Sequence, residues 1–148
     1  MAALKSQLAQ APVFMPGDGC AMIVTDKYTV AANPTIGDTI DFRIPGGMEV
    51  TDVYIQTDDL DTNGAPTIAY TVGYSPIQAE TIYTEDLTYF STAALGVTSK
   101  TGGRLSCVFK PKKFNEDVWL RVKFTAAAAT FAAGDIIAIV HGNAKGVS

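Results

Sequence analysis

A single histidine, His141, limits the nucleophilic and acid–base chemistry that this chain could perform. A Ser-His-Asp or Cys-His arrangement needs an imidazole as its base, so any such site would have to include His141. The chain has no GxSxG turn, and Gly73-Tyr74-Ser75-Pro76 is typical of a strand end. We therefore expect His141 to be an ordinary surface or hydrogen-bonded residue at the end of a strand, and we expect no enzymatic activity.

One segment, Asp59-Leu60-Asp61-Thr62-Asn63-Gly64, has a spacing that suggests a metal ion. It matches the opening of a calcium loop, in which alternate side-chain oxygens converge on the cation. The twelfth position, where that loop needs a bidentate Glu, is Tyr70, and strand-like alternation from Ile68 replaces the second helix. An acidic hairpin loop explains the same residues, because Asn and Gly accept a positive φ. We expect no cofactor and no metal, with calcium as the alternative.

The two cysteines, Cys20 and Cys107, form no CxxC pair and lie in apolar, strand-like surroundings. This usage favours buried thiols in a reducing compartment over a disulfide framework, with a single bridge between them as the alternative. One histidine and two distant cysteines are too few ligands for a zinc site.

The composition indicates one folded domain: the chain has 148 residues, of which 47% are hydrophobic and 18% charged. A chain of this length buries about 70% of its extended surface, so it needs no disulfide or metal to hold a core. The net charge is -4, and the tightest basic group is Lys110, Lys112 and Lys113 around Pro111. Nucleic-acid binding needs clustered basic residues, and a membrane span needs about 18 apolar residues in a row. We expect neither partner, and we expect synthesis in a cytoplasm, because residues 1–16 lack a continuous apolar export signal.

Alternation of apolar and polar residues with a period of two recurs along the chain and predicts half-buried strands. About seven or eight such segments follow one another at intervals typical of an antiparallel β-sandwich. The segments are Met22–Val30, Thr39–Ile44, Val53–Gln56, Ile68–Tyr74, Leu105–Phe109, Val118–Phe124 and Ile136–His141. The last is apolar on both faces, which indicates a central or covered strand.

Two segments do not fit this alternation. Glu85 to Leu95 is predicted to form a helical turn or a loop. Thr125 to Ala133 is rich in alanine and favours helix by propensity, but Phe131 and the following Gly134-Asp135 are more typical of a connection into the last strand. We therefore expect a loop there.

The first 19 residues differ from the rest and predict an extended N-terminal arm, followed by a sandwich domain over residues 20–148. Pro12 and Pro16 prevent one helix from running through the arm. The apolar triplet Val13-Phe14-Met15 would be a liability in water unless it packs on another surface.

Three segments between Val30 and Gly142 resemble a known family. Ile36–Val50 is a strand that runs through Pro45-Gly46-Gly47 into a second apolar strand. Val53–Tyr74 contains an acidic-loop hairpin, and Ala129–Ile136 has a threonine, small residues and a glycine before the last strand. These segments are similar to those of the small jelly-roll cement, or decoration, proteins on the capsids of tailed bacteriophages.

The resemblance implies an all-β, antiparallel jelly-roll sandwich of about eight strands with no enzymatic role. It implies a protein that binds the outer surface of the major capsid lattice and stabilises the head, as a homodimer or homotrimer made in the host bacterial cytoplasm. The major capsid protein is then the expected partner.

Apolar residues of the arm are the first candidates for contact with the capsid protein or with a second copy. These candidates are Leu4, Leu8, Val13, Phe14 and Met15. Trp119 is a further candidate, because the alternation turns it outward, on the same face as Arg121 and Lys123. An outward Trp beside cations makes either a local cation–π contact or an interface anchor, and the sequence favours neither.

A carbohydrate-binding or adhesin-like sandwich, for example on a head fibre or tail, is the alternative function. Jelly rolls also serve as lectins, and Trp119, Tyr54 and Tyr74 would then stack on sugar rings. The sequence shows no clear row of aromatic residues with polar partners, which favours the capsid role.

Overall fold

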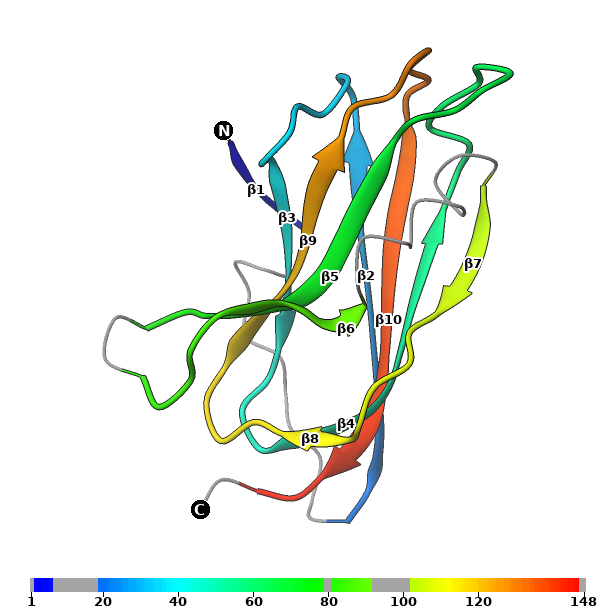
Figure 1. Ribbon diagram of the computed structural model, residues 1–148. Coiled ribbons are helices and arrows are strands. Elements are labelled where there is room, and N and C mark those ends of the chain that lie inside the picture. The colour runs from blue at the N-terminus through cyan, green and yellow to red at the C-terminus, as the bar shows by residue number, and fades with distance from the viewer. Residues whose placement is uncertain (1, 7–18, 79–80, 92–101, 147–148) are drawn as a thin grey trace.

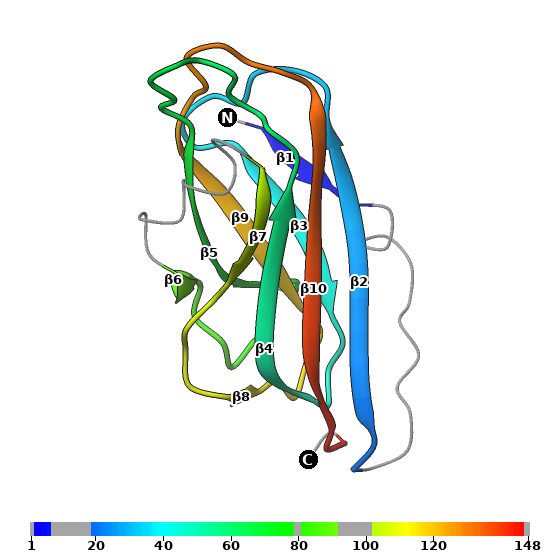
Figure 2. The same ribbon diagram turned by 90° about the vertical axis from the view of Figure 1, so that its right-hand side faces the viewer.

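The computed structural model describes residues 2–6, 19–78, 81–91 and 102–146. These residues form two five-stranded sheets packed face to face, with no helix among them (Figures 1 and 2). The predicted all-β sandwich is therefore confirmed. In the described part of the chain, no helix is long and apolar enough to cross a membrane.

The first sheet has the strand order β1-β3-β9-β5-β6, and the second has the order β2-β10-β4-β7 with β8 beside β4. The first sheet consists of β1 (Ala3–Lys5), β3 (Thr39–Ile44), β9 (Val118–Ala126), β5 (Ala69–Pro76) and β6 (Asp86–Ser91). The second consists of β2 (Ala21–Val30), β10 (Gly134–Ala144), β4 (Met48–Thr57), β7 (Gly103–Ser106) and β8 (Lys112–Lys113).

Strand pairing is nested, which is the jelly-roll arrangement. β2 pairs with β10, β3 with β9, β4 with β7, and β5 with β6, all antiparallel. Eight strands thus form the predicted jelly roll, and the described residues add two short strands, β8 beside β4 and β1, which pairs parallel with β3. β10 lies between β2 and β4, as its two apolar faces predict.

The core lies between the sheets and is filled from alternate residues of each strand. On β9, for example, Val118, Leu120 and Val122 are fully buried, whereas Trp119 and Arg121 between them are half-buried on the outer face. Successive side chains of a strand point to opposite faces of the sheet. The apolar residues that recur with a period of two in the sequence therefore all point into the core. The largest fully buried side chains include Tyr70, Phe42, Phe90, Phe114 and Phe124.

The prediction of a helical turn or loop from Glu85 to Leu95 was wrong for Asp86–Ser91, which form strand β6 at the edge of the first sheet, and residues 92–95 lie outside the described residues. Phe90 is fully buried, and its ring meets that of Phe109 at 4.7 Å between centroids. Only one side chain of this short edge strand is fully buried, which is too little alternation to be detected in the sequence. Of the loop predicted from Thr125 to Ala133, residues 127–133 form a loop, whereas Thr125 and Ala126 belong to β9.

The start of the predicted arm belongs to the sandwich. Ala3–Lys5 form β1, which pairs with β3 in parallel, and Leu4 packs against the core. Lys5 forms an ion pair with Asp41 of β3, which fixes this short strand from the outer face. The other arm candidates, Leu8, Val13, Phe14 and Met15, lie outside the described residues.

Gly73 lets β6 approach β5 closely. A Cβ at this position would lie 2.0 Å from the carbonyl oxygen of Asp86 and 2.4 Å from backbone atoms of Leu87. Gly73→Ala should therefore push β6 away and lower the free energy of unfolding by about 3 kcal/mol. Gly64→Ala is the matched control, because a Cβ there meets nothing within 4 Å, and it should change stability by less than about 0.5 kcal/mol. Urea unfolding measures both, and equal stability of the two variants would contradict the close approach.

Candidate protein-interaction surfaces

Three loops meet at one end of the sandwich, the upper end in Figure 1, and we call them the apical loops: residues 31–38, 58–67 and 127–133. Asp61 lies among them with an exposed fraction of 1%. Its carboxylate accepts hydrogen bonds from the backbone N–H groups of Thr67 (2.7 Å), Ile68 (3.1 Å), Ala129 (3.0 Å) and Thr130 (2.9 Å). One side chain therefore joins two of the loops.

Burial raises the pKa of Asp61, but the hydrogen bonds from Thr130, Ala129, Thr67 and Ile68 outweigh burial and hold the pKa well below its usual range. The side chain stays ionised at neutral pH. This pKa shift shows how strongly the backbone donors favour the charged form of the carboxylate.

The oxygens of the proposed calcium segment are used by the backbone of the loop itself. Asp59 Oδ1 accepts from the Asp61 N–H at 3.2 Å, and Asn63 Oδ1 accepts from the Ala65 N–H at 2.9 Å. The predicted hairpin loop was wrong, because the segment connects β4 of the second sheet to β5 of the first, and neither Asn63 nor Gly64 has a positive φ. Its side-chain oxygens instead accept hydrogen bonds from N–H groups two residues further along the loop, as in Asx turns. Among the described residues, no group of three or more His, Cys, Asp or Glu side chains is placed to hold a metal ion.

Further side chains connect the apical loops. The Asn33 amide donates to the carbonyl of Ala128 and accepts from its N–H, both at 3.0 Å. Thr67 Oγ1 donates to the Ala127 carbonyl at 2.8 Å. The exposed tips carry small uncharged residues such as Asn63, and Ile36 at 72% exposure. Asp58 and Asp59 are exposed in the same loops, so the apical surface combines uncharged and acidic side chains.

The outer face of the first sheet is tied together by buried ions. Asp41 has no exposed surface, and its carboxylate accepts from Arg121 Nε at 2.6 Å and Arg121 Nη2 at 2.9 Å, besides its ion pair with Lys5. Arg121 continues to Glu85 at 2.9 Å, which also accepts from Ser75 at 2.7 Å. The hydrogen bonds to Asp41 outweigh burial and raise the pKa of Arg121. These charges satisfy one another within the sheet.

Trp119 belongs to this ion-paired face. The Lys5 ammonium lies 4.1 Å from the centroid of the indole ring, so the local cation–π contact is formed. A role of Trp119 as an interface anchor stays a prediction.

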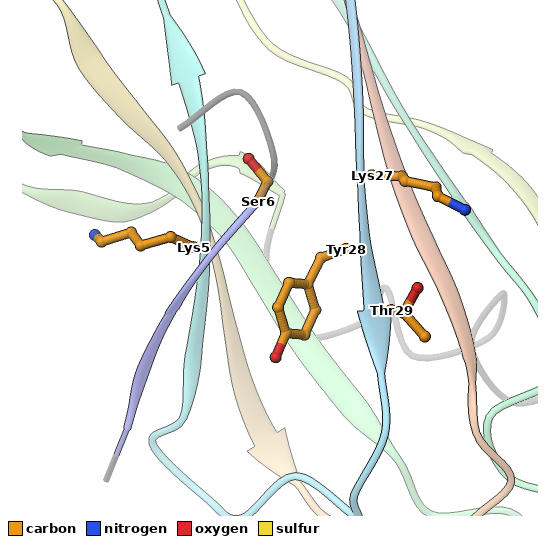
Figure 3. Close-up of a pocket in the computed structure, with 5 residues that line it drawn as sticks. All are labelled: Lys5, Ser6, Lys27, Tyr28 and Thr29. Carbon is orange, nitrogen blue, oxygen red and sulfur yellow. The ribbon is translucent and has the colours of Figure 1, made fainter. Parts of the chain in front are cut away.

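A hollow of about 270 Å³ opens where β1 and β2 border the side of the sandwich (Figure 3). Lys5, Ser6, Lys27, Tyr28 and Thr29 line it. In Figure 3 the two lysine side chains point away from each other and from the hollow, and their ammonium groups pair with Asp41 and Asp135. No set of polar groups converges on a ligand, so the hollow is a seam between the sheets, bridged by a hydrogen bond from Ser6 to Asp26.

The outer face of the second sheet is different in character, and we call it the apolar face. Ile137 and Ile139 of β10 are half-buried there, and Ile23 of the neighbouring β2 is 64% exposed. The His141 ring meets that of Tyr54 at 5.3 Å between centroids. His141 lies within β10 and not at its end, because the strand continues to Ala144.

The group of lysines around Pro111 forms no free basic patch. Lys112 lies in β8, and its ammonium lies 5.2 Å from the ring centroids of both Tyr74 and Tyr89 and about 6 Å from those of Tyr83 and Phe114. Such a setting stabilises a cation by cation–π attraction. The basic residue thus serves the packing of the sandwich.

The aromatic residues considered for sugar binding do not share a surface. Trp119 lies on the ion-paired face and Tyr54 on the apolar face, whereas Tyr74 points inward and is 7% exposed. A stacking platform needs the rings side by side, so this trio provides none.

Cys107 is buried, as predicted, and burial raises the pKa of its thiol to about 12. Cys20 is exposed, contrary to the prediction, because it precedes the first residue of β2. Both thiols are free, so the alternative of a bridge between them is wrong.

No protein-family model matches the chain, and no curated protein matches it by sequence. Solved structures do match. A chain in the capsid of Ralstonia phage GP4 superposes with a TM-score of 0.72 and 25% identity, covering 99% of this chain and 99% of that chain. A chain in the capsid asymmetric unit of cyanophage Pam1 gives a TM-score of 0.70 and 23% identity, covering 91% and 94%. Over nearly its full length, the chain is therefore similar to chains of phage capsids.

Asp61→Asn should destabilise the protein, because an amide brings two N–H donors toward backbone N–H groups that need an acceptor. We expect a loss of about 3 kcal/mol at neutral pH, measured by urea unfolding. Asp59→Asn is the control and should cost little, since its Oδ1 is retained and the side chain is exposed.

The same pair tests the ionisation of Asp61. A carboxyl whose pKa is lowered by folding stabilises the protein above its unfolded pKa, about 4, and loses that contribution as the pH falls toward its folded pKa. The difference in the free energy of unfolding between wild type and Asp61→Asn should therefore be largest at pH 7 and decrease as the pH falls below about 4. A difference that is independent of pH would contradict this assignment.

Proposed function

We propose that this chain is a structural, non-enzymatic component of a phage virion that binds the outer surface of the major capsid lattice and reinforces the head. The observation that carries the proposal is the match to a chain in the capsid of Ralstonia phage GP4, which spans 99% of both chains at 25% identity. The match covers nearly all of this chain, so the shared fold includes both sheets of the sandwich.

The rigidity of the molecule supports this role. A protein that must sit on a lattice binds best when its surface is already ordered, because little conformational entropy is then lost on docking. Asp61 and Asn33 fix the apical loops, and the Asp41 ion pairs fix the first sheet. The buried groups that would usually point to catalysis here hold backbone and strands in place.

The many identical binding positions on a capsid also support the proposed role. Many copies on one lattice make modest contacts collectively strong, provided that the geometry lets them engage together. A sandwich of 148 residues can therefore stabilise a head without a large interface of its own.

The apolar residues of the N-terminal region are the proposed anchors. Leu4 already packs against the core of its own chain, so Val13, Phe14 and Met15 are the better residues to change. Deletion of residues 1–16 would remove β1 as well and would confuse binding with folding.

The test is co-sedimentation of the purified protein with heads that lack it, followed by thermal melting of the loaded heads. Wild type should bind the heads at fixed stoichiometry and raise the temperature at which they break. A triple variant, Val13→Ser, Phe14→Ser and Met15→Ser, should keep the melting temperature of the free protein and weaken head binding about tenfold or more.

Ile82→Ser is the matched control, since this exposed isoleucine, 73% accessible, lies in the loop before β6 and is assigned no contact. It should bind heads like wild type. Failure of wild type to bind the heads would overturn the proposed function. Normal binding by the triple variant would overturn only the assignment of the anchors.

A further inference from the structure

We propose that the apolar face of the second sheet is a two-fold interface between two copies of this chain. Its centre is uncharged: Ile139 lies in register between Thr25 of β2 and Tyr54 of β4. Ile137 and Ile139 of this central strand are partly exposed and Ile23 is 64% exposed, so the face presents apolar surface. Protein interfaces are depleted of charge at their centres.

The charges on this face are incompletely neutralised, in contrast to those of the first sheet. Asp52, beside His141 in register, has no hydrogen bond or ion pair within the described residues. Arg104 of β7 meets only a neutral group among those residues, donating to Gln56 Oε1 at 3.0 Å, and its guanidinium lies 5.9 Å from the Tyr54 ring centroid. Asp52 and Arg104 thus lie on the same face, and neither has an oppositely charged partner among the described residues.

Their positions are self-complementary. Asp52 lies two residues before Tyr54 on β4, and Gln56, which pairs with Arg104, lies two residues after it. We place a two-fold axis in the plane of the face, perpendicular to the strands and passing through Tyr54. Rotation about this axis places each β4 strand over the β4 strand of the other copy in the opposite direction, so that Asp52 of one copy faces Gln56 of the other. The partner's Asp52 then arrives over Gln56, where the Arg104 guanidinium already lies.

The same two-fold rotation also brings apolar side chains of the two copies into contact. Ile139 of one copy meets Ile139 of the other on the axis, and the His141 ring lies over Ile137 of the partner. Ile23 lies over the alkyl stem of the partner's Lys27, because the two occupy exchanged levels of β2. Each contact therefore occurs twice: a residue of the first copy that contacts a second residue in the partner is matched by the same pair with the copies exchanged. Such reciprocal contacts define an isologous interface.

The size of the face is sufficient for a dimer. With a rise of about 3.3 Å per residue and about 4.8 Å between strands, β2, β10, β4 and the four-residue β7 present about 550 Å² per copy. The total of about 1,100 Å² exceeds the roughly 1,000 Å² needed for a specific interface. Face-to-face packing of twisted sheets is also a standard arrangement within proteins.

The test is the molar mass of the free protein by size-exclusion chromatography with light scattering, over a range of concentrations. Wild type should be a dimer. Ile139→Lys should weaken the dimer about 30-fold, the effect of losing a central contact. Ala69→Lys, on the outer face of the first sheet, is the control and should leave the dimer unchanged.

A charge exchange tests the register and keeps the proposal falsifiable if Ile139→Lys unfolds. Arg104 is exposed and Asp52 half-buried at the surface, so Arg104→Asp and Asp52→Arg should fold normally, which circular dichroism checks. Each single variant should weaken the dimer about tenfold by placing like charges together, and the double variant should restore it.

A monomer or trimer in wild type would overturn the proposal, since an in-plane two-fold axis closes at two copies. A dimer that tolerates Ile139→Lys, or single charge variants with no effect, would overturn it equally. The inference does not rest on head binding: dimerisation is measured without capsids, so its failure and the failure of the proposed function are separate results.

Discussion

The two sheets are held together by one layer of apolar side chains, and each strand must supply this layer from alternate residues. Strict alternation leaves the other half of every strand free to serve a second purpose. The outer face of the first sheet carries ion pairs around Asp41, and that of the second carries the half-buried Ile137 and Ile139. The core therefore imposes the fold while the outer faces differ in chemistry.

Buried carboxylates stabilise the parts of the structure that lie outside the apolar layer between the sheets. A buried charge is costly unless it is fully hydrogen-bonded, so each one favours a single arrangement of its donors. Asp61 receives backbone N–H groups from two loops, and Asp41 receives Arg121 and Lys5 from two neighbouring strands. Both carboxylates restrict the backbone around them, at the loop end of the sandwich and at the β1 edge of the first sheet.

The sequence predicted most of the sandwich, because strands such as Val118–Ala126 carry several apolar residues at a period of two. It missed β6, in which Phe90 alone is fully buried, and β1, whose three residues depend on an ion pair with a strand 36 positions away. The role of Asp61 was hidden for a related reason. Its segment resembles a metal loop, and only the fold brings Ala129 and Thr130 within reach. A similar limit applies to the apolar face, where the alternation exposes Ile137 and Ile139 but the position of Asp52 relative to Arg104 depends on strand register.

The Asp61 carboxylate has a consequence for how the molecule opens and closes. The amide protons of Thr67, Ala129 and Thr130 are held by a buried anion although these residues belong to connections between strands. Exchange of those protons with solvent deuterium requires the carboxylate to leave its site, and not merely local fraying. We therefore expect these loop amide protons to exchange more slowly than those of loops whose N–H groups bond only to water.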